Sequence, residues 1–104
     1  DATALPYLAA GGHGCISVTS NIAPKELAKM HDDWSAGNFS SAFEIHRKLI
    51  DLHDALFCES SPGPVKYAAN RLGICNSMAR LPITEISDKS KKIVDNAIHK
   101  IGLI

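Results

Sequence analysis

A short segment rich in β-branched side chains constrains the fold of this chain most strongly. Cys15–Thr19 reads Cys-Ile-Ser-Val-Thr, with glycines before it and Ser20 and Asn21 after it, a pattern typical of a β-strand. A strand needs neighbouring strands, because a buried backbone N–H or C=O without a partner costs about 1 to 3 kcal/mol. The other residues read almost entirely as helix. The sequence therefore predicts a piece of a larger sheet-containing protein, cut upstream of Gly11.

A short helix is expected just before this strand. Ala2–Ala10 places its leucines at helical spacing, and Gly11 and Gly12 then end the helix. A helix, a tight glycine loop and a strand, in this order, are typical of a repeating β/α unit. The pattern indicates an α/β fold built on a parallel sheet.

Helical patterns also fill most of the chain after the strand. The clearest has apolar residues every three or four positions and should form an antiparallel hairpin with the helix before it. An irregular segment, Ile74–Ile86, separates the last two helices, because Leu81 precedes a proline. The four helices are expected from Pro24 to Gly37, over Phe39–Phe57, over Val65–Leu72, and from the N-cap Ser87 to Gly102.

The charge and cysteine content exclude several classes of protein. Eleven basic and eleven acidic side chains cancel, so no strong field favours nucleic acid or an anionic membrane as a partner. No apolar run is long enough for a signal peptide or a membrane span. The cysteines Cys15, Cys58 and Cys75 are odd in number and form no Cys-x-x-Cys pair. This pattern is typical of reduced thiols and predicts a cytoplasmic protein.

The residue types that carry chemistry form no complete catalytic constellation. The histidines lack the spacing of metal ligands, and His46 and His53 lie seven residues apart on one apolar face, so both are interpreted as packed or interfacial. Lys66 could be a buried Schiff-base amine, but its place early in a short helix fits an exposed role better. No metal and no cofactor is expected.

Three separated motifs run in order along the chain. They are GGHGCISVTSN at Gly11–Asn21, LHDALFCESSPGPVKYAANRL at Leu52–Leu72 and RLPITEI at Arg80–Ile86. Together they resemble the carboxy-terminal part of the bacterial dihydrodipicolinate synthase family. The resemblance implies a (β/α)8 barrel with appended helices, in which residues 1–36 end the barrel and residues 37–104 form the helical extension. The chain itself would be mostly α-helical, with one β-strand.

The same resemblance implies an activity for the full-length parent. The family is a lyase that condenses pyruvate with aspartate semialdehyde through a lysine Schiff base, in diaminopimelate and lysine biosynthesis. It is usually a homotetramer and needs no cofactor. Its Schiff-base lysine and its tyrosine relay would precede the present residues, so this chain carries no catalytic residue and is predicted to be inactive alone.

Two residues are expected near the substrate. Ile16 matches the family's isoleucine that lines the pyruvate pocket, at the catalytic end of the barrel. Asp1 matches the end of a Gly-Asp-Asp motif and is expected beside the same pocket.

Two other interpretations remain open. A sister pyruvate-dependent aldolase, such as N-acetylneuraminate lyase, would share the barrel and the imine chemistry, although Ser61–Lys66 and Arg80–Pro82 favour the synthase. The chain could also be an autonomous helical interaction module that uses the apolar stripe of Phe39–Phe57, but this leaves Cys15–Thr19 unexplained. If barrel-facing surfaces are uncovered, we expect the chain to self-associate.

Overall fold

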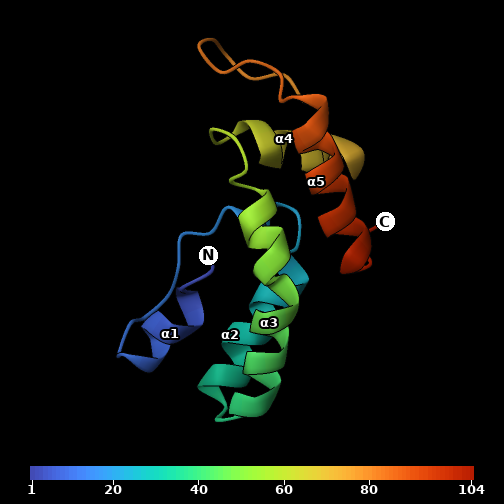
Figure 1. Cartoon of the computed structure of the whole chain (residues 1–104). Helices are drawn as coiled ribbons and strands as arrows, with labels where there is room; N and C mark the ends of the chain where they lie inside the picture. Colours follow the sequence, from blue (N-terminus) through green and yellow to red (C-terminus); the bar gives the residue numbers. More distant parts are fainter.

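Helices make up the regular structure of the chain, as Figure 1 shows in a computed structural model that describes residues 1–104. The elements are α1 (Ala4–Ala9), the 3-10 turn η1 (Thr19–Asn21), α2 (Pro24–Ser35), α3 (Phe39–Ala55), α4 (Gly63–Arg71) and α5 (Asp88–Lys100). The molecule is elongated, about 41 × 26 × 21 Å, with α1 and the α2–α3 hairpin at one end and α4 and α5 at the other (Figure 1).

The 17-residue helix α3 joins the two ends of the molecule. It packs against α2 along the hairpin, and it also contacts α1 and α5. Leu49, Leu52 and Leu56 are fully buried in these contacts. Because α3 meets three other helices, the arrangement of the whole chain depends on it.

The helix ends follow local sequence signals. Pro24 opens α2, where a missing N–H removes no helical hydrogen bond. Gly37 adopts φ +82° in the turn between α2 and α3, a backbone conformation that glycine reaches without strain. Ser87 caps α5 as predicted, and its hydroxyl accepts a 3.2 Å hydrogen bond from the Ser90 N–H.

The prediction of a β-strand at Cys15–Thr19 is wrong. Gly12–Ser17 is neither helix nor strand, and none of the amides from His13 to Ser17 donates a hydrogen bond within the chain. The β-branched composition favours extended backbone, but a ladder needs a second strand and the chain supplies none. From Val18 on, the backbone instead turns into η1.

Other predictions are confirmed with small shifts. The α2–α3 hairpin and α5 lie where expected, and Ile74–Ile86 is irregular apart from a turn. α4 begins at Gly63, two residues earlier than expected, because Pro64 fits inside the first turn. None of the helices is long and apolar enough to cross a bilayer.

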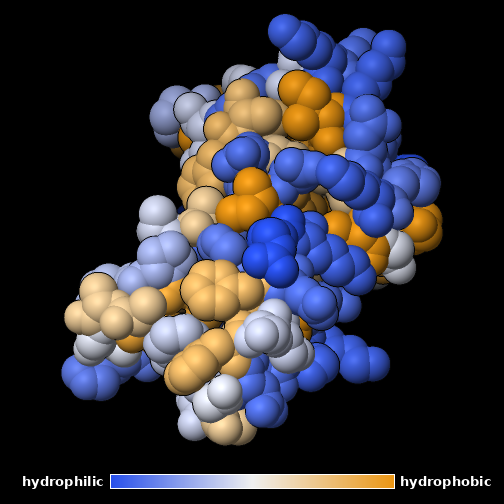
Figure 2. Space-filling model, turned by 60° about the horizontal axis from the view of Figure 1, so that its bottom comes forward, coloured by the Kyte–Doolittle hydropathy of each residue, from blue (hydrophilic) through white to orange (hydrophobic).

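Many large apolar side chains lie at the surface. Figure 2 shows the face at the bottom of Figure 1, where hydrophobic residues lie in patches between hydrophilic ones. Over the whole chain, the exposed large apolar residues are Tyr7, Ile16, Phe39, Phe43, Phe57, Ile74, Met78, Leu81, Ile93 and Ile104. Surface of this kind indicates contact with further polypeptide.

Candidate functional site

The carboxylate of Asp1 organises the segment that precedes α2. Its Oδ2 atom accepts hydrogen bonds from the backbone N–H groups of Val18, at 2.9 Å, and Thr19, at 3.1 Å. Its Oδ1 atom accepts from the Ser17 hydroxyl, and the Cys15 thiol lies 3.8 Å away. The carboxylate thereby accepts the free amides at the start of η1. The carboxylate therefore acts here as a structural anchor.

Ile16 lies between two of these donors but does not join them. The side chains of Cys15 and Ser17 both reach Asp1, whereas Ile16, between them, is left in solvent. Ile16 is fully exposed, at 106% of the reference area for the residue. The structure places the Asp1 carboxylate against the turn that follows Ile16, and it leaves the Ile16 side chain exposed.

A buried histidine supports the same turn from α3. The Thr19 hydroxyl oxygen lies 2.7 Å from His53 Nδ1, and these residues are 0% and 2% exposed. A neutral imidazole suits this contact, because one ring nitrogen can accept a hydrogen bond from a hydroxyl while the other nitrogen carries the ring proton. The bond joins segments that are 34 residues apart in the sequence.

The surroundings of His53 keep its ring neutral. The pKa of His53 is lowered to about 4, mainly by burial and also by the nearby amino terminus and His46, while Asp54 acts in the opposite direction. Its Nε2 atom is buried and makes no hydrogen bond within the chain. Burial likewise lowers the pKa of His46. The interpretation of His53 as a packed histidine is confirmed.

A cleft of about 370 Å³ lies beside this network. Its lining comes from the start of the chain and from the end of α3: Asp1, Ala2, Thr3, His53, Asp54 and Phe57. No lysine lines it. The cleft offers carboxylates and a neutral imidazole, and the anchoring bonds already occupy one of those carboxylates.

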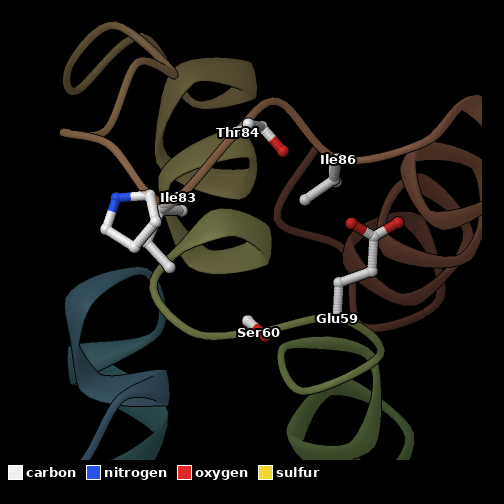
Figure 3. Close-up of a pocket in the computed structure, with 6 residues that line it drawn as sticks. Glu59, Ser60, Ile83, Thr84 and Ile86 are labelled. Atoms are coloured by element: carbon white, nitrogen blue, oxygen red, sulfur yellow. The ribbon is translucent and has the colours of Figure 1, made fainter.

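A second cleft of about 350 Å³ separates the end of α3 from the segment before α5. Figure 3 shows Glu59 and Ser60 on one side and Ile83, Thr84 and Ile86 on the other, with the Glu59 carboxylate directed across the gap. That carboxylate accepts a 2.9 Å hydrogen bond from the Ser87 N–H. Bonding to Ser90 and Ser87 holds the pKa of Glu59 below its usual range. The negative charge of Glu59 therefore stabilises the start of α5, and this contact is structural.

The remaining candidates form no reactive cluster. Lys66 is half-buried on α4 beside Val65, Ile74 and Cys75, and its amine pairs with no carboxylate. The histidines, cysteines and carboxylates nowhere gather in a group of three that could hold a metal ion.

The Thr19–His53 pair was missed by the sequence analysis. His53 was correctly placed on the apolar face of its helix, but Thr19 was assigned to a strand. A histidine on a leucine-rich stripe is a signal that a polar partner is needed, since a buried imidazole without a hydrogen bond is costly. The sequence carries no signal for a partner 34 residues away.

The whole chain matches solved structures of dihydrodipicolinate synthases, which are (β/α)8-barrel enzymes. The enzyme from Thermotoga maritima aligns with a TM-score of 0.96 and 39% identity, over 99% of this chain and 35% of that one. A chloride-inhibited dihydrodipicolinate synthase from Acinetobacter baumannii, complexed with pyruvate, aligns with a TM-score of 0.92 and 36% identity, over the same shares.

Sequence comparison gives the same assignment. The model of the Dihydrodipicolinate synthetase family matches residues 1–101, and the chain belongs to this family. It is 49% identical over 104 residues to a 4-hydroxy-tetrahydrodipicolinate synthase from Gluconacetobacter diazotrophicus. That alignment covers 100% of this chain and 35% of the relative, so the chain spans about a third of the length of the protein it matches.

Proposed function

We propose that this chain is the carboxy-terminal part of a lyase that condenses pyruvate with aspartate semialdehyde in lysine biosynthesis. The observation that carries the proposal is the family match over residues 1–101. In this reaction a lysine amine attacks the pyruvate ketone and releases water, and the resulting imine gives an enamine that attacks the aldehyde. The lysine and the proton-relaying tyrosine belong to the part of the parent outside these residues.

Ile16 is the residue of this chain that we assign to the pyruvate pocket. Its side chain is fully exposed on a turn whose neighbouring side chains are held by Asp1. An exposed apolar side chain on an anchored backbone suits the wall of a pocket completed by other residues. The pyruvate bound to the Acinetobacter baumannii enzyme supports this choice of ligand. Asp1 shapes the pocket indirectly, through the turn.

The amides of His13–Ser17, which donate no hydrogen bond within the chain, support a place at the end of a barrel. In the parent, this segment would pair with neighbouring barrel strands. Residues 1–36 would then complete the barrel, and residues 37–104 would form the helical extension. We further propose a homotetrameric, cytoplasmic parent that uses no cofactor.

Trapping of the imine tests this function. The 104-residue chain is incubated with pyruvate and borohydride, which reduces an imine to a stable amine. The mass of the chain is then measured by mass spectrometry. We expect no adduct on the chain alone. A fusion of the chain behind the amino-terminal two-thirds of the Gluconacetobacter diazotrophicus relative should give one adduct per subunit and should consume aspartate semialdehyde.

Two results would contradict the proposal. A stoichiometric adduct on the chain alone, for example at Lys66, would show that it contains its own reactive amine. A fusion that folds but forms no adduct would show that this chain cannot complete the pocket. An assay with N-acetylneuraminate separates the sister aldolase, and we expect no cleavage of that substrate.

A further inference from the structure

We propose that His53 is a positioning residue for the pyruvate pocket: through Thr19 it fixes the turn that presents Ile16. This inference rests on the proposed function, since it concerns the pocket that function requires. His53 lies at the end of α3 and does not contact Ile16, so its effect passes through the polypeptide between Thr19 and Ile16.

Thr19 is the residue through which the effect is transmitted. Its backbone N–H donates to Asp1 Oδ2 at 3.1 Å, while its side-chain oxygen lies 2.7 Å from His53 Nδ1. One residue thereby connects three segments of the chain: the amino terminus, η1 and α3. Because Thr19 is 0% exposed, water cannot readily replace either bond.

Apart from the contacts of the Cys15 and Ser17 side chains with Asp1, the segment before Thr19 has few hydrogen bonds of its own. Between Gly12 and Ser17 the backbone forms no helix or strand, and Gly12 alone donates a backbone hydrogen bond, to Tyr7. The orientation of Ile16 therefore depends on its connection to Ser17 and Thr19. A loss of the His53 contact would free the turn at its buried end.

The histidine is itself held rigidly. Leu52 on α3 and Leu56, directly after the helix, are fully buried, and His53 is 2% exposed. Because this side chain is closely packed, it holds the turn in a fixed position relative to α3. Support of this kind keeps a binding residue in its productive geometry.

Two matched pairs of variants isolate the contact. Thr19→Val removes the hydroxyl at nearly constant volume, whereas Thr19→Ser keeps it. His53→Asn places an amide where Nδ1 lies, whereas His53→Gln places its amide near Nε2, away from Thr19. The conservative member of each pair should keep the bond and the other should lose it.

Amide hydrogen exchange in the 104-residue chain measures the turn directly. We expect Thr19→Val and His53→Gln to accelerate exchange at Val18 and Thr19 by about tenfold, the effect of one lost hydrogen bond. Thr19→Ser and His53→Asn should stay close to the unsubstituted chain. Unchanged exchange in both disruptive variants would overturn the proposal. If these variants unfold, the ring ¹⁵N shifts of His53 in the unsubstituted chain still report the bond, and shifts of a free imidazole would overturn it.

Steady-state kinetics of the fusion protein tests the consequence for pyruvate. We expect Thr19→Val and His53→Gln to raise the KM for pyruvate about tenfold with little change in kcat, as a displaced pocket wall predicts. Thr19→Ser and His53→Asn should restore the KM. Ser87→Ala, which removes the distant cap of α5, is the structural control and should leave the KM for pyruvate unchanged.

The outcomes separate this inference from the proposed function. An unsubstituted fusion that folds without forming a borohydride adduct overturns the proposed function. If the unsubstituted fusion forms the adduct, but Thr19→Val and His53→Gln have the same KM for pyruvate as the Ser87→Ala control, the proposed function stands and the role of His53 is overturned.

Discussion

The hydroxyl of Tyr67 on α4 donates a 3.0 Å hydrogen bond to Asp95 on α5. The other oxygen of this carboxylate accepts a 2.8 Å bond from Arg71 Nε. Burial raises the pKa of Tyr67, and the Asp95 charge raises it further. A carboxylate shared by two donors of one helix fixes how α4 and α5 pack.

Removal of the Tyr67 hydroxyl should loosen this packing. We expect Tyr67→Phe to lower the free energy of unfolding by about 1 kcal/mol, because Asp95 loses a hydrogen bond while the ring volume is kept. Urea unfolding followed by circular dichroism measures the change. Tyr7→Phe is the matched control, since Tyr7 is 58% exposed, and an equal loss in both variants would contradict the role of Asp95.

The stability of the chain should fall on mild acidification because of His53. Its pKa of about 4 in the folded chain lies below the ordinary value of 6.5, so the unfolded state takes up the proton first. The stabilisation is complete above about pH 6.5 and is lost as the pH falls toward 4. We expect a loss of about 2 kcal/mol between pH 7 and pH 5, measured as urea unfolding free energies.

His53→Asn provides the control for this pH dependence. Asparagine does not titrate, so between pH 7 and pH 5 the variant should lose only the smaller contribution of His46, whose pKa burial also lowers. The carboxylates of Asp33 and Glu59, whose pKa values are lowered by hydrogen bonds, lose their stabilisation only at more acidic pH. A variant with the same pH profile as the unsubstituted chain would assign the acid sensitivity to another group.

Truncation of the buried face of α3 should be severe. Leu52 is fully buried, and we expect Leu52→Ala to cost about 2 to 5 kcal/mol through lost burial and the cavity that remains. Phe43→Ala on the same helix should cost much less, because Phe43 is 38% exposed. Thermal melts of both variants test the difference, and equal losses would contradict the described packing of α3.

The exposed apolar side chains predict self-association of the isolated chain. Light scattering at increasing concentration should show particles larger than 11.2 kDa. Replacement of Phe39 and Phe57 by serine should shift the distribution toward monomer, because both side chains are about half exposed. A monomer at all concentrations would show that these patches do not attract one another.

The helical part of the fold could be predicted from the sequence, and the extended segment could not. Proline at the start of α2, Ser87 before α5 and the leucine stripe of α3 are local signals, and each marks an element that the structure contains. The strand at Cys15–Thr19 depended on partners outside these residues. Its composition indicated extended backbone, but hydrogen-bonded pairing is a property of at least two segments.

The candidate site was predictable only in part, for a similar reason. Ile16 and Asp1 came from the resemblance, and in the structure Asp1 binds the residues that directly follow Ile16. The link to His53 crosses 34 residues, and neither periodicity nor local motifs report contacts at that range. The buried imidazole marked one end of the contact but did not identify Thr19 as the other.

The length of α3 has a consequence for how such chains can change. A residue added near its middle would rotate everything that follows by about 100° about the helix axis and advance it by about 1.5 Å. His53 would then face away from Thr19, and α5 would lose its packing against the buried leucines of α3. Insertions and deletions should therefore be tolerated in the irregular stretch between α4 and α5, while α3 keeps a fixed number of residues.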